Sequence, residues 1–319
     1  MKGRKLIILT ALAAVLCSCG PRKKAASAPA VQTREFPMAE VPMMITEPAE
    51  RLVWLGQHFW DRFTVVDSLY YCDSVTVNGV TLENLEKQMG IFASILQEVP
   101  LSDGVRSMEV FYERLEAFQL AKPAGNVLPQ TVALATRYFY DPNSPVRSED
   151  LYLPFVTRLA ASALIDPDYR MGYEWDAEKC ALNRTGTKAA DFVFVDTEGK
   201  RRTLYGIKAS RILLIFGNPD CTACKEIQET FTQYPELSAQ IADGTLKVVD
   251  IYIDEDIELW KARKAAYPAS WINGYDPGFS IRTDLIYNVR AVPSLYLLDE
   301  NKTVLLKDAV PERVLQALL

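Results

Sequence analysis

An apolar run, a turn and two closely spaced cysteines constrain the C-terminal part of this chain more than any other feature. The segment Arg211–Phe216 is predicted to be a strand covered on both faces, and the turn 217–220 separates it from Cys221-Thr-Ala-Cys224. A helical run follows from Lys225. The positive end of a helix favours a thiolate at Cys221, and Cys224 is close enough to resolve a mixed disulfide. The pattern predicts reversible disulfide chemistry, although a Cys-x-x-Cys pair alone could also be half of a zinc site.

The N-terminus has the features of a bacterial export signal. Three cationic residues precede the apolar stretch 6–16, which is too short to span a bilayer. The sequence Leu16-Cys-Ser-Cys19 resembles a lipobox, in which the signal peptide ends at residue 18 and Cys19 carries the lipid. We therefore expect a signal peptide over residues 1–18 and a membrane anchor at Cys19. The alternative is ordinary cleavage without lipid.

Residues 19–45 are predicted to be a lipidated tether. The segment 20–40 is rich in Pro, Ala, Ser and cationic residues, a composition that buries too little apolar surface to fold. No acidic run follows Cys19, so we expect a lipid-anchored protein of the cell envelope that faces the periplasm. The formal net charge of the whole chain is −6 at pH 7, which argues against nucleic acid as a partner.

Apolar residues recur at helical spacing between residues 47 and 183, which predicts a mainly α-helical domain over residues 46–184. The clearest apolar faces follow residues 82–99 and 105–118. Asp166 and Pro167 form an N-cap and first-turn pair that opens a later helix.

This half contains no cluster of residues that predicts an active site. Strand character is limited to residues 75–80, where Asn78-Gly79 favours a tight turn. His58 is the only histidine of the chain and is predicted to be structural, like the many aromatic residues around it. Cys72 and Cys180 either bridge each other or stay free, and a zinc site would need these residues or His58 to converge with the Cys-x-x-Cys pair.

After residue 186 the pattern changes to alternating short strands and helices. This alternation predicts an α/β domain over residues 188–319, a central sheet with helices on both faces. The expected strands are 190–196, 212–216, 246–253, 295–298 and 303–306, and the expected helices run from 257 to about 267, near 284–287 and over 312–319.

This stretch resembles the TlpA/ResA-like branch of the thioredoxin superfamily. The matching residues, besides the cysteine pair, are Ala190-Asp-Phe192, Gly199-Lys200 and Val292-Pro293-Ser294. The resemblance implies a thioredoxin-like fold with a mixed sheet, and a cis peptide bond at Pro293 beside the two cysteines. The helical half resembles, more weakly, an uncharacterised domain that precedes such modules in exported lipoproteins.

Three positions depart from the family pattern. Asp220 replaces the usual aromatic residue before the first cysteine, and Thr-Ala stands between the cysteines. Ile215 occupies the position, six residues before Cys221, where thioredoxins carry a buried carboxylate that relays protons. Glu226 and Asp254 are the candidates for that proton relay here.

The resemblance implies a thiol–disulfide oxidoreductase without a cofactor. Cys221 is the nucleophile, Cys224 resolves the mixed disulfide, and Pro293 shapes the surface where the substrate pairs. The expected partners are exported proteins with disulfides and a membrane redox donor. Two alternatives stay open: a non-catalytic lipoprotein that binds a partner or glycan, and a peroxiredoxin-like peroxidase, whose Pro-x-x-x-Thr-x-x-Cys loop is missing before Cys221.

Overall fold

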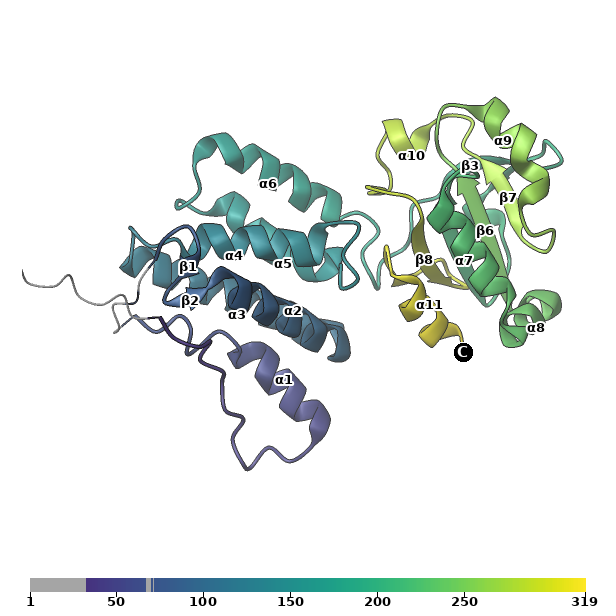
Figure 1. Cartoon of the computed structure of the whole chain (residues 1–319). Helices are drawn as coiled ribbons and strands as arrows, with labels where there is room; N and C mark the ends of the chain where they lie inside the picture. Colours follow the sequence, from purple (N-terminus) through teal and green to yellow (C-terminus); the bar gives the residue numbers. More distant parts are fainter. Residues whose placement is uncertain (1–32, 67–69, 71) are drawn as a thin grey trace, which may run out of the picture.

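The computed structural model describes residues 33–66, 70 and 72–319, which form a helical domain and a sheet domain with separate cores (Figure 1). The predicted signal peptide and Cys19 lie outside the described residues. Within the part that is described, no helix is long and apolar enough to cross a membrane.

The helical domain packs its helices around a core rich in aromatic side chains, in which Trp60 stacks on Phe111 with ring centroids 4.6 Å apart. Side-chain caps fix several helix starts, such as Thr81, whose hydroxyl accepts a hydrogen bond from the backbone of Asn84 at 3.2 Å. The predicted helices are confirmed, whereas α4 was not predicted. The elements are α1 (Pro48–His58), β1 (Thr76–Val77), β2 (Val80–Thr81), α2 (Leu82–Glu98), α3 (Leu101–Ala121), α4 (Val127–Ala135), the π-helix η1 (Thr136–Tyr140), α5 (Glu149–Ala161) and α6 (Pro167–Cys180).

The end of the predicted tether packs on this domain. Phe36 is only 6% exposed and stacks on Phe63 with ring centroids 5.3 Å apart. The guanidinium of Arg34 donates hydrogen bonds to the backbone carbonyls of Phe63 and Asn78. The prediction of a free tether over residues 19–45 is therefore wrong around residues 34–36. The composition of this segment disfavours folding, but burial of the aromatic ring of Phe36 is enough to hold it against the domain.

The sheet domain is built on a seven-stranded mixed sheet with the strand order β4-β3-β7-β6-β5-β8-β9. Strand β5 pairs parallel with β6 and antiparallel with β8. Helices α7, α8 and α11 cover one face of the sheet, and α10 with the segment around Phe192 covers the other. The elements are β3 (Val193–Asp196), β4 (Arg201–Thr203), the 3-10 helices η2 (Leu204–Gly206) and η3 (Lys264–Ala266), β5 (Arg211–Gly217), α7 (Thr222–Thr232), α8 (Pro235–Asp243), β6 (Leu246–Tyr252), α9 (Ile257–Arg263), β7 (Ile272–Tyr275), α10 (Ser280–Thr283), β8 (Ser294–Asp299), β9 (Val304–Leu306) and α11 (Pro311–Leu318).

Sequence periodicity missed α8 and β7 and misplaced one short helix. The helix expected near 284–287 lies earlier, at α10, and Leu285 has a positive φ of 51° that ends helical geometry there. Strand β7 contains Gly274, where an added Cβ would lie 2.7 Å from the carbonyl oxygen of Val195. This close approach explains a glycine in a strand, a residue that otherwise argues against strand structure.

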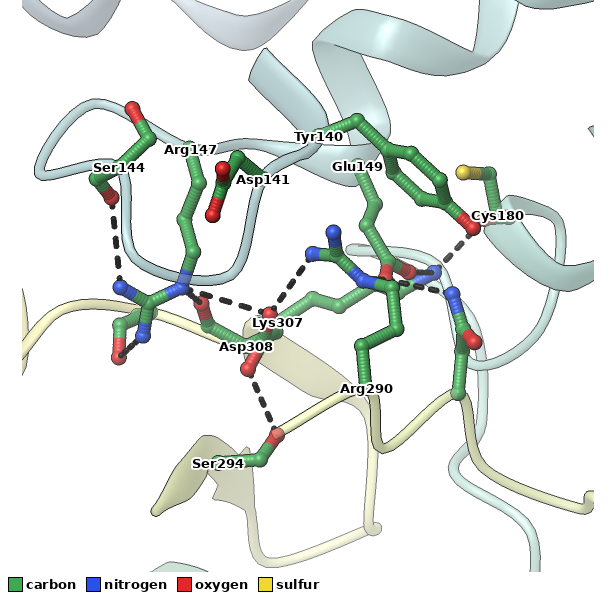
Figure 2. Close-up of polar contacts among 12 residues, drawn as sticks. Tyr140, Asp141, Ser144, Arg147, Glu149, Cys180, Arg290, Ser294, Lys307 and Asp308 are labelled. Carbon is green, nitrogen blue, oxygen red and sulfur yellow. Dashed lines mark hydrogen bonds and ion pairs between the residues drawn. The ribbon is translucent and has the colours of Figure 1, made fainter. Parts of the chain in front are cut away.

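A cluster of buried charges joins the two domains (Figure 2). Glu149, at the start of α5, accepts hydrogen bonds from Asn288 Nδ2 at 2.6 Å and from Arg290 Nε at 2.9 Å. Its other carboxylate oxygen lies 2.8 Å from the ammonium group of Lys307, and both side chains are 1% exposed. Lys307 also donates to two backbone carbonyls, at the last residue of α6 and two residues beyond it.

Asp308 extends this network along the domain boundary. Its Oδ2 atom lies 3.2 Å from Arg290 Nη2 and 3.4 Å from Nε of Arg147, which belongs to the helical domain. The Arg290 guanidinium also lies 4.1 Å from the ring centroid of Tyr140. We call this network the interdomain charge cluster, which comprises Arg147, Glu149, Arg290, Lys307 and Asp308.

Glu149→Gln should lower the free energy of unfolding by about 3–5 kcal/mol, because it leaves the buried ammonium of Lys307 without its counter-charge. Urea denaturation measures this change. Glu109→Gln is the matched control, since it removes an exposed ion pair with Arg106 and should cost less than about 1 kcal/mol. Equal losses in the two variants would contradict a stabilising role for the cluster.

Candidate active site

The two cysteines lie in the first turn of helix α7, directly after the end of strand β5. Helix α7 begins at Thr222, three residues earlier than predicted, and Cys221 is its N-cap. The backbone N–H of Cys224 donates a hydrogen bond to Cys221 Sγ at 3.2 Å. This bond and the positive end of the helix stabilise negative charge on the Cys221 sulfur.

The loop that carries Pro293 lies against Cys221. The Val292–Pro293 peptide bond is cis, which confirms that part of the prediction. Cys221 Sγ lies 3.7 Å from the carbonyl oxygen of Val292. Ser294 follows in β8, and its hydroxyl donates to Asp308 Oδ1 at 2.7 Å, so the interdomain charge cluster anchors this loop (Figure 2).

A buried carboxylate, Asp250, lies under helix α7. It belongs to β6, whose parallel register pairs it with Ile215 of β5. Gln228, one helical turn after Cys224, donates its side-chain N–H to Asp250 Oδ2 at 3.2 Å. Asp250 is 1% exposed, and its burial raises the pKa of the carboxyl to about 7.

Asp250 acts on the resolving cysteine. Burial raises the pKa of the Cys224 thiol most, followed by its interactions with Cys221, and the negative charge of Asp250 adds a smaller effect in the same direction. Gly217 gives the carboxylate room, since a Cβ at this residue would lie 2.8 Å from Asp250 Oδ1. Burial thus favours the protonated form of Cys224 and of Asp250, and both groups lie at the same end of α7.

The sequence missed Asp250 and named two other acids as the proton relay. Glu226 is exposed on α7, and among the described residues its carboxylate makes no hydrogen bond with either thiol. Asp254 is held by Asn218 Nδ2 at 2.7 Å and by Arg282 at 2.5 Å. The available signal was a single aspartate within the apolar run of β6.

The other candidate residues lie away from this site. The four described cysteines are unbridged, so Cys72 and Cys180 do not pair in this structure. Burial raises the pKa of the Cys180 thiol. His58 bonds Asp61 at 2.8 Å and stacks on Trp54, in keeping with a structural role. Among residues 33–66, 70 and 72–319, no group of three His, Cys, Asp or Glu residues could hold a metal ion.

Known proteins resemble both domains. Residues 18–180 match the model of DUF5106, a domain of unknown function. A thioredoxin-like protein from Bacteroides caccae is 31% identical, over 90% of this chain and 99% of its own, with a TM-score of 0.76. The C-terminal domain of an uncharacterized protein from Bacteroides fragilis is 43% identical, over 43% of this chain and 97% of its own, with a TM-score of 0.42. No curated protein matches the chain.

The Bacteroides caccae protein has the helical and sheet domains in one chain, because the similarity extends over almost all of both proteins. This similarity confirms the predicted fold class, a thioredoxin-like α/β domain preceded by a mainly helical domain.

Asp250→Asn should stabilise the protein more at pH 8 than at pH 4. The carboxyl has a pKa of about 7 in the folded protein and about 3.9 in an unfolded chain. Between these values the folded state binds the proton more tightly, so stability falls as the pH rises towards 7 and stays low above it. Asparagine cannot ionise and so avoids this loss, which is about 4 kcal/mol for a difference of about three pKa units.

Urea denaturation of the reduced protein at the two pH values measures the difference. Asp284→Asn changes an exposed aspartate and is the control. It should change the free energy of unfolding only slightly, and by the same amount at pH 4 and pH 8. An Asp250→Asn effect that is equal at pH 4 and pH 8 would show that Asp250 does not titrate as we infer.

Proposed function

The chain belongs to the DUF5106 family and, through its thioredoxin-like domain, to the thioredoxin superfamily, and from this we propose that it is a membrane-tethered thiol–disulfide oxidoreductase that reduces disulfides of exported proteins. One observation carries the proposal. Cys221 caps helix α7 opposite the cis-Pro293 loop, while Cys224 lies behind it in the same turn, above the buried Asp250.

The first step is attack by the Cys221 thiolate on one sulfur of a substrate disulfide. A bond forms between Cys221 Sγ and that sulfur, the substrate disulfide breaks, and its other sulfur leaves as a thiolate that takes a proton from solvent. Cys221 is partly exposed and can meet a substrate, whereas Cys224 is buried and cannot. Burial thus separates the attacking thiol from the resolving thiol.

The second step needs a base, because the Cys224 thiol is held in its protonated form. Asp250 takes this proton, for which a pKa near the working pH is best suited. The Cys224 thiolate then attacks Cys221 Sγ, the Cys221–Cys224 disulfide forms, and the substrate's second sulfur leaves as a thiolate. The substrate gains two electrons and the protein loses two.

A dithiol donor of the membrane must then reduce the Cys221–Cys224 disulfide for another cycle. Reduction rather than oxidation of substrates is supported by the two residues between the cysteines, Thr222 and Ala223. Neither is cationic, and strong oxidants depend on a stabilised reduced form. The membrane location rests on the lipobox at Cys19, and the tether keeps the enzyme among exported substrates.

A Cys224→Ser variant expressed in the native host tests the proposal. Without the resolving thiol, Cys221 should stay joined to its substrates, so non-reducing gels should show discrete adducts that disappear on reduction. The adducts should fractionate with membranes and leave that fraction when Cys19→Ala is added.

Two double variants serve as controls. Adducts should be lost from the Cys221→Ser, Cys224→Ser protein and kept in the Cys72→Ser, Cys224→Ser protein, because Cys72 lies in the helical domain away from the site. Absence of adducts that depend on Cys221 would overturn the oxidoreductase function. In that case binding by the helical domain would become the better account.

A further inference from the structure

A groove of about 370 Å³ lies beside the cysteine pair, and both domains line it. One side is formed by α7 and the cis-proline loop, with Ala223, Val292 and Pro293. Helix α11 lines the groove through residues that include Glu312. The helical domain contributes Pro142, Asn143 and Arg147, which lie in the loop between η1 and α5.

The helical-domain side of this groove is fixed in place. Arg147 Nε donates to the backbone carbonyl of Asp308 at 3.1 Å, and its Nη2 donates to that of Ala309 at 3.5 Å. The same Asp308 accepts the hydroxyl of Ser294, the residue after Pro293 (Figure 2). Asp308 therefore contacts both sides of the groove, Arg147 through its backbone carbonyl and its Oδ2 atom and Ser294 through its Oδ1 atom, so the width of the groove is set by contact between the domains.

The groove carries net negative charge. Glu226 on α7 and Glu312 on α11 line it, both are exposed, and neither has an ion-pair partner among the described residues. Arg147 also lines the groove, but Asp308 compensates its charge. A cationic side chain in the groove would therefore find two free carboxylates, while an acidic one would be repelled.

We propose that the helical domain forms one wall of the substrate site, and that this groove takes an extended peptide segment with a lysine or arginine beside its disulfide cysteine. This inference rests on the proposed function, since two residues that line the groove, Ala223 and Val292, are adjacent to Cys221 in the chain or in contact with it. In this arrangement the segment pairs with the backbone of the cis-proline loop, which contacts Cys221 through Val292, and the groove walls select its side chains. The domain of unknown function thus contributes to substrate choice.

Two disulfide-linked peptides that differ only in a Lys or a Glu next to the cysteine test the charge preference. The wild-type protein should show a kcat/KM at least five-fold higher for the Lys peptide. In the Glu226→Gln, Glu312→Gln variant this ratio should fall towards one. The matched control Glu229→Gln, Glu236→Gln changes two exposed glutamates that do not line the groove and should keep the ratio.

A second pair of variants tests the helical-domain wall. Asn143→Trp adds bulk to the exposed loop at the groove, and it should lower kcat/KM for the Lys peptide at least five-fold relative to that for hydroxyethyl disulfide. Asn301→Trp makes the same change in an exposed turn between β8 and β9 and should keep this ratio. Unchanged ratios in Asn143→Trp would overturn the two-domain site.

Turnover of hydroxyethyl disulfide distinguishes the role of the groove from the oxidoreductase function, because this compound is too small to need the groove. Turnover of this compound with equal rates for the Lys and Glu peptides overturns the inference and leaves the oxidoreductase function standing. No Cys221-dependent turnover of any of the three substrates overturns both.

Discussion

Glu149 is the residue on which the arrangement of the two domains depends. Its carboxylate binds Asn288, Arg290 and Lys307, three side chains of the sheet domain, from the first turn of a helix in the other domain. Burying these charges carries a large desolvation penalty, which is offset only when every charged and polar partner is in place. The contact is therefore specific, and it fixes the helical domain next to the cis-proline loop.

The same contact links the domain boundary to the chemistry. Arg290 lies three residues before Pro293, and Ser294 follows Pro293. Both side chains donate hydrogen bonds to the carboxylate of Asp308. Through these bonds the helical domain holds the loop that faces Cys221 and supplies a wall of the adjoining groove. A thioredoxin-like module alone would lack this wall, so the helical domain changes which substrates the proposed site can accept.

Much of this architecture follows from patterns in the chain. Helical periodicity predicts α2 and α3, and the cysteine pair with Val292-Pro293 marks the proposed reacting centre, because these signals are local. Asp250 is different. Its role appears only when the parallel register sets it beside Ile215, where the family pattern expects the carboxylate. In this chain the acid is on the neighbouring strand and still lies under the same helix.

The contact between the two domains could not be predicted from the sequence, for a similar reason. Glu149, Arg290 and Lys307 lie far apart in the chain, and each alone has the pattern of a surface residue. At Phe36 the sequence predicted too little structure. A single aromatic side chain holds a segment whose composition is typical of a free tether. Long-range pairing, rather than local propensity, decides both cases.

The central claim is that Asp250 takes the Cys224 proton when the mixed disulfide on Cys221 is resolved. Rapid-mixing kinetics of this resolution step, followed from pH 5 to pH 9, tests it most directly. The wild-type rate should rise as the pH passes about 7, the pKa of Asp250. In Asp250→Asn the rate at pH 7.5 should fall at least ten-fold and its rise should move to higher pH. An Asp250→Asn protein with the wild-type rate and pH profile would contradict the account.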